Sequence, residues 1–115
     1  MEVFRGNSIP ITINATYKDG SQYIFKSGDT VILGIKKYVG CPECDYTERQ
    51  VATDAVSNIT FNISPEHTCN LEGEYVLEAT LIYNNGVDVS TLFQEELIVK
   101  GVVNNEWNNR NFTRS

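Results

Sequence analysis

The chain has 115 residues, of which 41% are hydrophobic and 10% aromatic, and its formal net charge is −6. This length suits one domain, and this composition supports a packed core, which excludes an intrinsically disordered chain. The acidic surface disfavours nucleic acid and anionic lipid headgroups as partners, because both repel negative charge. Since no apolar run approaches the roughly 20 residues of a transmembrane helix, we expect no membrane insertion.

Short segments of alternating polarity, separated by turn residues, fill the first part of the chain. Every second residue from 9 to 17 is apolar, which predicts a half-buried strand. Pro10 in this strand lacks the N–H that a sheet hydrogen bond needs, so we expect the strand at an edge. Further strands are predicted at residues 23–25, 30–36, 47–53 and 59–63.

The second part of the chain carries clearer turn and cap signals. Ser64 and Pro65 suit the cap and the first position of a single helical turn. A regular strand is predicted at 75–83, followed by Asn84-Asn85-Gly86, a strong hairpin signal. The last strand is predicted at 88–100, and its irregular apolar spacing indicates a bulge.

These elements predict an all-β fold, an immunoglobulin-like antiparallel β-sandwich of about seven strands. We assign the sandwich to residues 1–100 and a polar C-terminal tail or linker to residues 101–115. Trp107 and Phe112 are the large aromatic residues of this tail, and we interpret them as side chains that dock on a neighbour.

The three cysteines and the single histidine lie in two clusters, Cys41-Pro42-Glu43-Cys44 and His67-Thr68-Cys69. The loops that hold them follow the third and fifth predicted strands, which end at the same pole of an up-and-down sandwich. Because Cys-x2-Cys is the usual half of a tetrahedral zinc site, the candidate ligands of one structural zinc are Cys41, Cys44, His67 and Cys69. The alternative is that Cys69 is a buried packing residue, His67 is exposed, and Cys41 and Cys44 form a thiol pair or a disulfide.

Catalytic signals are weak in this sequence. Cys-Pro-x-Cys is typical of thioredoxin-like enzymes, but there the first thiolate lies at the start of a helix, and no helical pattern follows Cys44. One histidine excludes most histidine-based relays, and the common hydrolase, phosphate-loop and metalloprotease motifs are absent from the sequence. We therefore expect the chain not to be an enzyme, and a dithiol oxidoreductase is the hypothesis that ranks last.

Four segments carry a family resemblance: Phe4–Ile13, Gly28–Lys37, Ile59–Thr68, and Leu71–Tyr75 with its Gly-x-Tyr strand start. They resemble the N-terminal domains of phage baseplate upper proteins and the small immunoglobulin-like proteins of prophage tail regions in Gram-positive bacteria. The Cys-Pro-Glu-Cys loop departs from the family pattern. The resemblance brings no catalytic residues, and it implies a structural role in a tail or baseplate through self-association or docking onto larger tail proteins.

From this resemblance we expect other phage tail or baseplate proteins, or further copies of the chain, as partners. Met1–Gly6 lacks the apolar core of a secretion signal, so we expect the protein in the host cytoplasm before assembly and in the virion afterwards.

Binding would use a strand edge or an end loop, and the candidate contact residues are Pro10, Tyr38, Tyr46 and Trp107. The alternative function is a carbohydrate- or surface-binding module. That function needs a row of exposed aromatic side chains, and only Tyr38, Tyr46 and Trp107 qualify as candidates.

Overall fold

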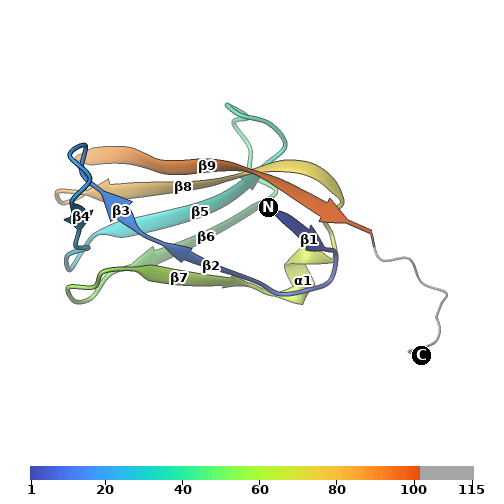
Figure 1. Ribbon diagram of the computed structural model, residues 1–115, viewed down its shortest axis with the longest axis horizontal. Coiled ribbons are helices and arrows are strands. Elements are labelled where there is room, and N and C mark those ends of the chain that lie inside the picture. Colours follow the sequence, from blue (N-terminus) through green and yellow to red (C-terminus); the bar gives the residue numbers. More distant parts are fainter. Residues whose placement is uncertain (102–115) are drawn as a thin grey trace.

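The computed structural model describes residues 1–101, which form nine strands and one helical turn in two layers (Figure 1). The larger layer is a five-stranded sheet in the order β1-β9-β8-β5-β6. Its strands are β1 Glu2–Phe4, β9 Asp88–Lys100, β8 Gly73–Tyr83, β5 Thr30–Lys36 and β6 Tyr46–Val51. The predicted all-β, sandwich-like fold is confirmed.

The smaller layer consists of two strand pairs and the helical turn. The pairs are β2 Ile9–Ile13 with β7 Ile59–Ile63, and β3 Ala15–Thr16 with β4 Gln22–Tyr23. Helix α1, Pro65–Thr68, follows β7 directly. Pro65 occupies the first turn as predicted, where its missing N–H leaves no hydrogen bond unmade. Ser64 holds the cap position, but its side chain makes no cap hydrogen bond, so that part of the prediction is wrong.

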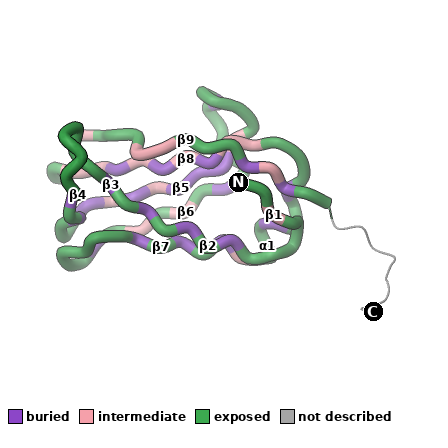
Figure 2. Tube along the Cα trace, viewed as in Figure 1, coloured by how far each residue is buried: buried purple, intermediate pink, exposed green. Residues whose placement is uncertain are grey.

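The core lies between the two layers. Strands in both layers bury about every second side chain there (Figure 2). Strands β2 and β7 show strict alternation, with three buried residues each. The side chains that are fully buried include Phe25, Phe61, Ile13, Leu33, Ile35, Ile63, Leu77, Leu97, Val31 and Val99. At roughly 25 cal/mol per Å² of apolar area removed from water, burial of these side chains is the main favourable term for folding.

The β8–β9 hairpin matches the sequence prediction closely. Asn84 and Asn85 have φ values of 55° and 58°, and Gly86 has a φ of 85°. These positive φ values are the left-handed conformation that asparagine and glycine favour in hairpin turns. The register shifts between Ala79 and Thr80, so β9 contains one extra residue at Leu92. This irregularity is the bulge that the uneven apolar spacing predicted.

Three features of the fold differ from the sequence prediction. Strand β1 was not predicted, because three residues are too few to show a period, and it pairs with β9 in parallel rather than antiparallel. The strand predicted at 9–17 is divided at Asn14 into β2 and β3. In place of the strand predicted at 23–25, the structure has β4 at Gln22–Tyr23, and Phe25 forms an isolated bridge with Val56.

Three strand edges, on β2, β9 and β6, have features that discourage pairing with another chain. Strand β2 pairs only with β7, and Pro10 removes one donor from this strand, as expected for an edge. Strand β9 pairs with β1 only at Ile98–Lys100, and the bulge at Leu92 interrupts the remainder of its outer edge. On β6, the Gln50 side chain donates to the Thr60 carbonyl at 2.7 Å and so bridges this edge to β7.

Candidate interaction surface

The loop at residues 37–45 projects from the sandwich between β5 and β6 (Figure 1). Two hydrogen bonds define it: Asp45 donates its N–H to the Ile35 carbonyl at 2.7 Å, and Cys41 donates to the Tyr38 carbonyl at 3.1 Å. Between them Gly40 takes a φ of 83°, which turns the chain at the tip. The side chains of Tyr38 and Val39 are therefore held at the surface, and they are 59% and 63% exposed.

A groove of about 470 Å³ lies beside this loop, on the outer face of the five-stranded sheet. One wall is the loop itself, at Lys37, Tyr38 and Val39. The floor and the other wall come from β8 and β9, at Glu74, Tyr75, Val76, Gln94, Glu95 and Glu96. The groove thus joins an end loop to the face of the central hairpin.

The β8–β9 register explains why acidic and apolar side chains meet in this groove. Leu77 and Leu97 are buried and face the core, so the alternate residues Glu74, Val76 and Glu96 face outward. Val76 lies directly opposite Glu96 in the antiparallel pair. The result is an apolar strip with carboxylates along its rim, which we call the acid-rimmed groove.

Two carboxylates of the acid-rimmed groove have no ion-pair partner among residues 1–101, and these are Glu74 and Glu96. Their neighbour Glu95 lies 3.3 Å from the N-terminal ammonium group. Lys37 in the loop wall is the one cationic side chain among the described lining residues, against three carboxylates, so the lining as a whole carries net negative charge. Such a surface attracts a cationic partner and repels an anionic one.

A polar trio borders the groove and fixes the sheet beneath it. Lys36 Nζ lies 2.7 Å from Glu78 Oε1, and Gln94 Nε2 donates to Glu78 Oε2 at 2.6 Å. The hydrogen bond from Lys36, and then that from Gln94, hold the pKa of Glu78 below its ordinary value. The hydrogen bond between Lys36 and Glu78 also raises the pKa of Lys36. This trio links β5, β8 and β9 across their outer face.

The predicted contact residues lie in different environments. Tyr38 lies in the wall of the acid-rimmed groove, and Pro10 is exposed on β2. The expectation that Tyr46 is an exposed aromatic is wrong: it is only 9% exposed, and its hydroxyl donates to Glu48. Tyr46 begins β6 opposite Ile35, on the face that packs into the core. Trp107 lies outside the described residues.

The cysteine and histidine side chains lie at one end of the sandwich but on different faces of the sheet. Cys44 is exposed and its Sγ lies over Gly34, 3.2 Å from where a Cβ of that residue would be. Gly34 alternates with the buried Leu33 and Ile35, so this position is on the outer face. His67 instead packs its ring edge-on against Tyr46, at 4.7 Å between centroids, on the core side.

Of the other two cysteines, Cys41 lies in the loop at 37–45 and Cys69 directly follows α1. Cys41 is buried in the loop, and the exposed Cys69 directs its Sγ to the Glu66 carbonyl at 3.1 Å. Within residues 1–101 no group of three or more histidine, cysteine or acidic side chains is gathered as a metal site would require. The structural zinc held by Cys41, Cys44, His67 and Cys69 stays a prediction, and it would need a different conformation of the loop at 37–45.

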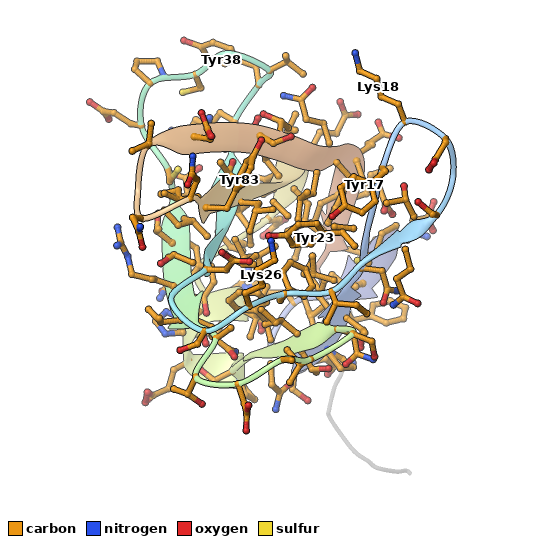
Figure 3. All side chains as sticks on the ribbon, turned by 90° about the vertical axis from the view of Figure 1, so that its left-hand side faces the viewer. Tyr17, Lys18, Tyr23, Lys26, Tyr38 and Tyr83 are labelled. Atoms are coloured by element: carbon orange, nitrogen blue, oxygen red, sulfur yellow. The ribbon has the colours of Figure 1, made fainter. Side chains whose placement is uncertain are left out.

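A second, polar pocket of about 340 Å³ lies near the other end of the sandwich, where Tyr23, Lys26 and Tyr83 approach one another (Figure 3). Tyr23 donates to Asp29 Oδ2 at 2.6 Å, and the Lys26 N–H donates to the same oxygen at 2.9 Å. The ring of Tyr23 also meets that of Tyr83 edge-on. Because Tyr23 and the Lys26 N–H both donate hydrogen bonds to Asp29, they hold the turn at residues 26–29 in place.

Sequence reasoning did not identify Val39, Glu74 and Glu96 as members of one surface. Glu74 and Glu96 are separated from the loop in sequence, and only the register of β8 on β9 and on β5 brings them together. The available signal was the alternation in residues 75–83, which places Val76 away from the core. That pattern alone does not reveal which loop lies over the same face.

Comparison with known proteins gave no match: no family model fits this sequence, and no curated protein or solved structure is significantly similar to it. In the described part of the chain, no helix has the length and apolar character needed to cross a bilayer.

Proposed function

We propose that the chain is a non-enzymatic structural module of a phage or prophage tail or baseplate, with an immunoglobulin-like sandwich that acts by protein–protein assembly. Its partners are other tail or baseplate proteins or further copies of the chain. It resides in the host cytoplasm before assembly and in the virion afterwards. The sequence resemblance supports the biological setting, and the surface of the molecule supports the mode of action.

The observation that carries the proposal is the exposure of Tyr38 and Val39 beside the acid-rimmed groove. Large apolar side chains held out at a loop tip gain from leaving water, and tyrosine is enriched in protein interfaces. The internal hydrogen bonds of the loop fix this shape before binding. A partner therefore meets a largely preformed surface, which lowers the entropic cost of association.

The strand edges support a loop-and-groove contact rather than strand addition. Pro10 removes a donor from β2, and the bulge at Leu92 breaks the regular outer edge of β9. Such devices prevent one sheet from pairing with another. The acid-rimmed groove has no comparable obstruction, and Glu74 and Glu96, which have no ion-pair partner among residues 1–101, favour a partner with basic side chains.

The carbohydrate-binding alternative receives less support from the described residues. A glycan surface of this type needs several exposed aromatic rings on one face. Tyr17 and Tyr38 are the most exposed tyrosines, at 53% and 59%, but Tyr17 follows β3 and Tyr38 follows β5, near opposite ends of the sandwich.

The test is the protein composition of purified particles. Particles released by the phage or prophage that encodes the chain are banded on a density gradient and analysed by quantitative mass spectrometry. We expect the chain at a fixed copy number per particle, co-migrating with the tail proteins. A chain found only in the unassembled fraction, with normal particles formed when its gene is deleted, would overturn the proposal.

A further inference from the structure

The outer face of the five-stranded sheet carries two cross-strand rows of mostly β-branched side chains. The register of β6, β5, β8 and β9 places the residues of the first row opposite one another, and these are Val51, Thr30, Ile82 and Val89. The same register gives the second row, which consists of Arg49, Ile32, Thr80 and Thr91. The members on β5 and β8 alternate with buried residues, so both rows point away from the core. We call the two rows together the branched face.

Strand β5 has the sequence pattern of a strand that is covered on both sides. A sheet with one face in water normally alternates apolar and polar residues, as β7 does with Thr60 and Asn62 outward. Residues 30–35 instead read Thr-Val-Ile-Leu-Gly-Ile, a nearly continuous apolar run. The second layer packs only on the inner face of this sheet (Figure 1), and Val51 and Val89 are 53% and 65% exposed. Within residues 1–101, no strand or helix covers the branched face.

The charge of the branched face favours a second copy of the chain as the partner. The chain has a net charge of −6, yet this face contains no carboxylate, and its one charged residue, Arg49, lies on the edge strand β6. In the adjacent row, Glu78 Oε1 lies 2.7 Å from Lys36 Nζ, so that carboxylate is compensated. Two acidic copies can therefore meet here without opposing carboxylates, whereas a strongly charged partner would lose hydration and gain no counter-charge.

The shape of the branched face also suits contact with an identical face. Valine, isoleucine and threonine are stiff at χ1, and they interdigitate when two sheets pack about 10 Å apart. Four strands about 4.8 Å apart and roughly five residues long give on the order of 300 Å² of sheet per copy. An interface of this size is at the weak end of the range for protein complexes. The loop at 37–45 lies at the other end of β5 and β6, so it leaves the branched face open (Figure 1).

We propose that the branched face binds the branched face of a second copy by sheet-on-sheet packing. The contact is weak between free copies, and it is occupied when an assembly holds neighbouring copies at effective concentrations in the mM range. The inference deepens the proposed function, and it rests on that function for the assembly that concentrates the copies. It assigns the second copy to the branched face and leaves the acid-rimmed groove to a different tail protein.

Sedimentation equilibrium of the full-length protein measures this contact. Between about 10 µM and about 1 mM, where weak contacts form, we expect the average mass to rise from 12.9 kDa toward twice that value. Val51→Lys/Val89→Lys should weaken the association at least about tenfold, because like charges then meet across the contact. Val51→Thr/Val89→Thr keeps the β-branched shape and should weaken it by a smaller factor. Added salt should strengthen the wild-type association, since it screens the repulsion between two acidic copies.

Two controls separate the branched face from general charge effects and from the groove. Ile24→Lys/Val56→Lys adds the same two charges at exposed apolar residues beside the Phe25–Val56 bridge, and it should associate like the wild type. Glu74→Gln/Glu96→Gln alters the acid-rimmed groove and should leave self-association in place. Circular dichroism first confirms that each variant folds.

Three results would overturn the inference. The first is a wild-type chain that stays monomeric at every concentration, which would leave the branched face to another protein or to residues 102–115. The second is unchanged association in Val51→Lys/Val89→Lys. The third is an equal loss in Ile24→Lys/Val56→Lys, which would show that the added charge, and not its position, weakens the contact.

The failure of this inference is distinguishable from the failure of the proposed function. If the chain is found in particles but the free protein stays monomeric at every concentration, the branched face does not bind a second copy and the assembly role stands. If the branched face forms a dimer but the chain is absent from particles, the self-association stands and the phage role fails.

Discussion

The hydroxyl of Tyr23 donates a hydrogen bond to Asp29 Oδ2 at 2.6 Å, and Asp29 is only 5% exposed. The carboxylate also accepts the N–H of Lys26, so one side chain holds both β4 and the turn that leads into β5. Burial, and then the bond to Asp29, raise the pKa of Tyr23 above its ordinary value.

Tyr23→Phe should destabilise the protein by about 1–3 kcal/mol, because it removes a donor from a buried carboxylate while keeping the ring in the core. Urea denaturation at pH 7 measures the change. The control is Tyr17→Phe, which alters an exposed tyrosine with no hydrogen bond from its hydroxyl among the described residues. Equal midpoints for Tyr23→Phe and the wild type would show that the Tyr23–Asp29 bond contributes nothing.

The Lys36–Glu78–Gln94 trio predicts a pH dependence of stability. Because the folded-state pKa of Glu78 lies below its unfolded value of about 4.5, its contribution is present above that pH and is lost as the pH falls through the folded pKa. Glu78→Gln should cost about 1 kcal/mol at pH 7 and should flatten the decline of stability between neutral pH and pH 3. Chemical denaturation across this range checks it, and a parallel decline in both proteins would contradict the assignment.

The β8–β9 turn predicts a clear glycine effect. Asn85 has a φ of 58°, a conformation that costs alanine about 1 kcal/mol but costs glycine nothing. Asn85→Ala should therefore lower the free energy of unfolding by about that amount, whereas Asn85→Gly should not. Thermal denaturation of the two variants provides the comparison, and equal losses would refute the turn geometry.

The zinc prediction is tested by native mass spectrometry of protein produced with zinc in the medium. If the site forms, the chain carries one zinc ion, and Cys44→Ser loses it. Since Cys44 and His67 lie on opposite faces of the sheet, binding must also move the loop at 37–45 and change the environment of Tyr38. A zinc-free wild type would reduce Cys41 to a packing residue.

The sequence predicted the parts of the fold that local patterns determine. Strict alternation identified β7 and β8, and Asn84-Asn85-Gly86 identified the turn between β8 and β9. The parallel pairing of β1 with β9 was not predictable, because it joins residues that are far apart in the chain and leaves no periodic signal in three residues. The burial of Tyr46 likewise depends on which face of β6 meets the core.

The candidate site was only partly predictable for the same reason. The loop at 37–45 could be recognised as an exposed connection, and Tyr38 could be named as a contact residue. That Tyr38 lines the same groove as Glu74 and Glu96 depends on the register of β5, β8 and β9, and local sequence patterns do not specify this register. The cysteine spacing pointed to a common pole, but it could not show that the sheet separates Cys44 from His67.

If the surface formed by Tyr38 and Val39 mediates assembly, changing it must lower the copy number of the chain in purified particles. Tyr38→Ser/Val39→Ser is compared with Val87→Ser, which changes a 74% exposed valine in the β8–β9 turn, away from the groove. Circular dichroism first confirms that both variants fold. We predict that Val87→Ser enters particles at the wild-type copy number and that Tyr38→Ser/Val39→Ser does not. Equal incorporation of both variants would show that this surface does not mediate assembly.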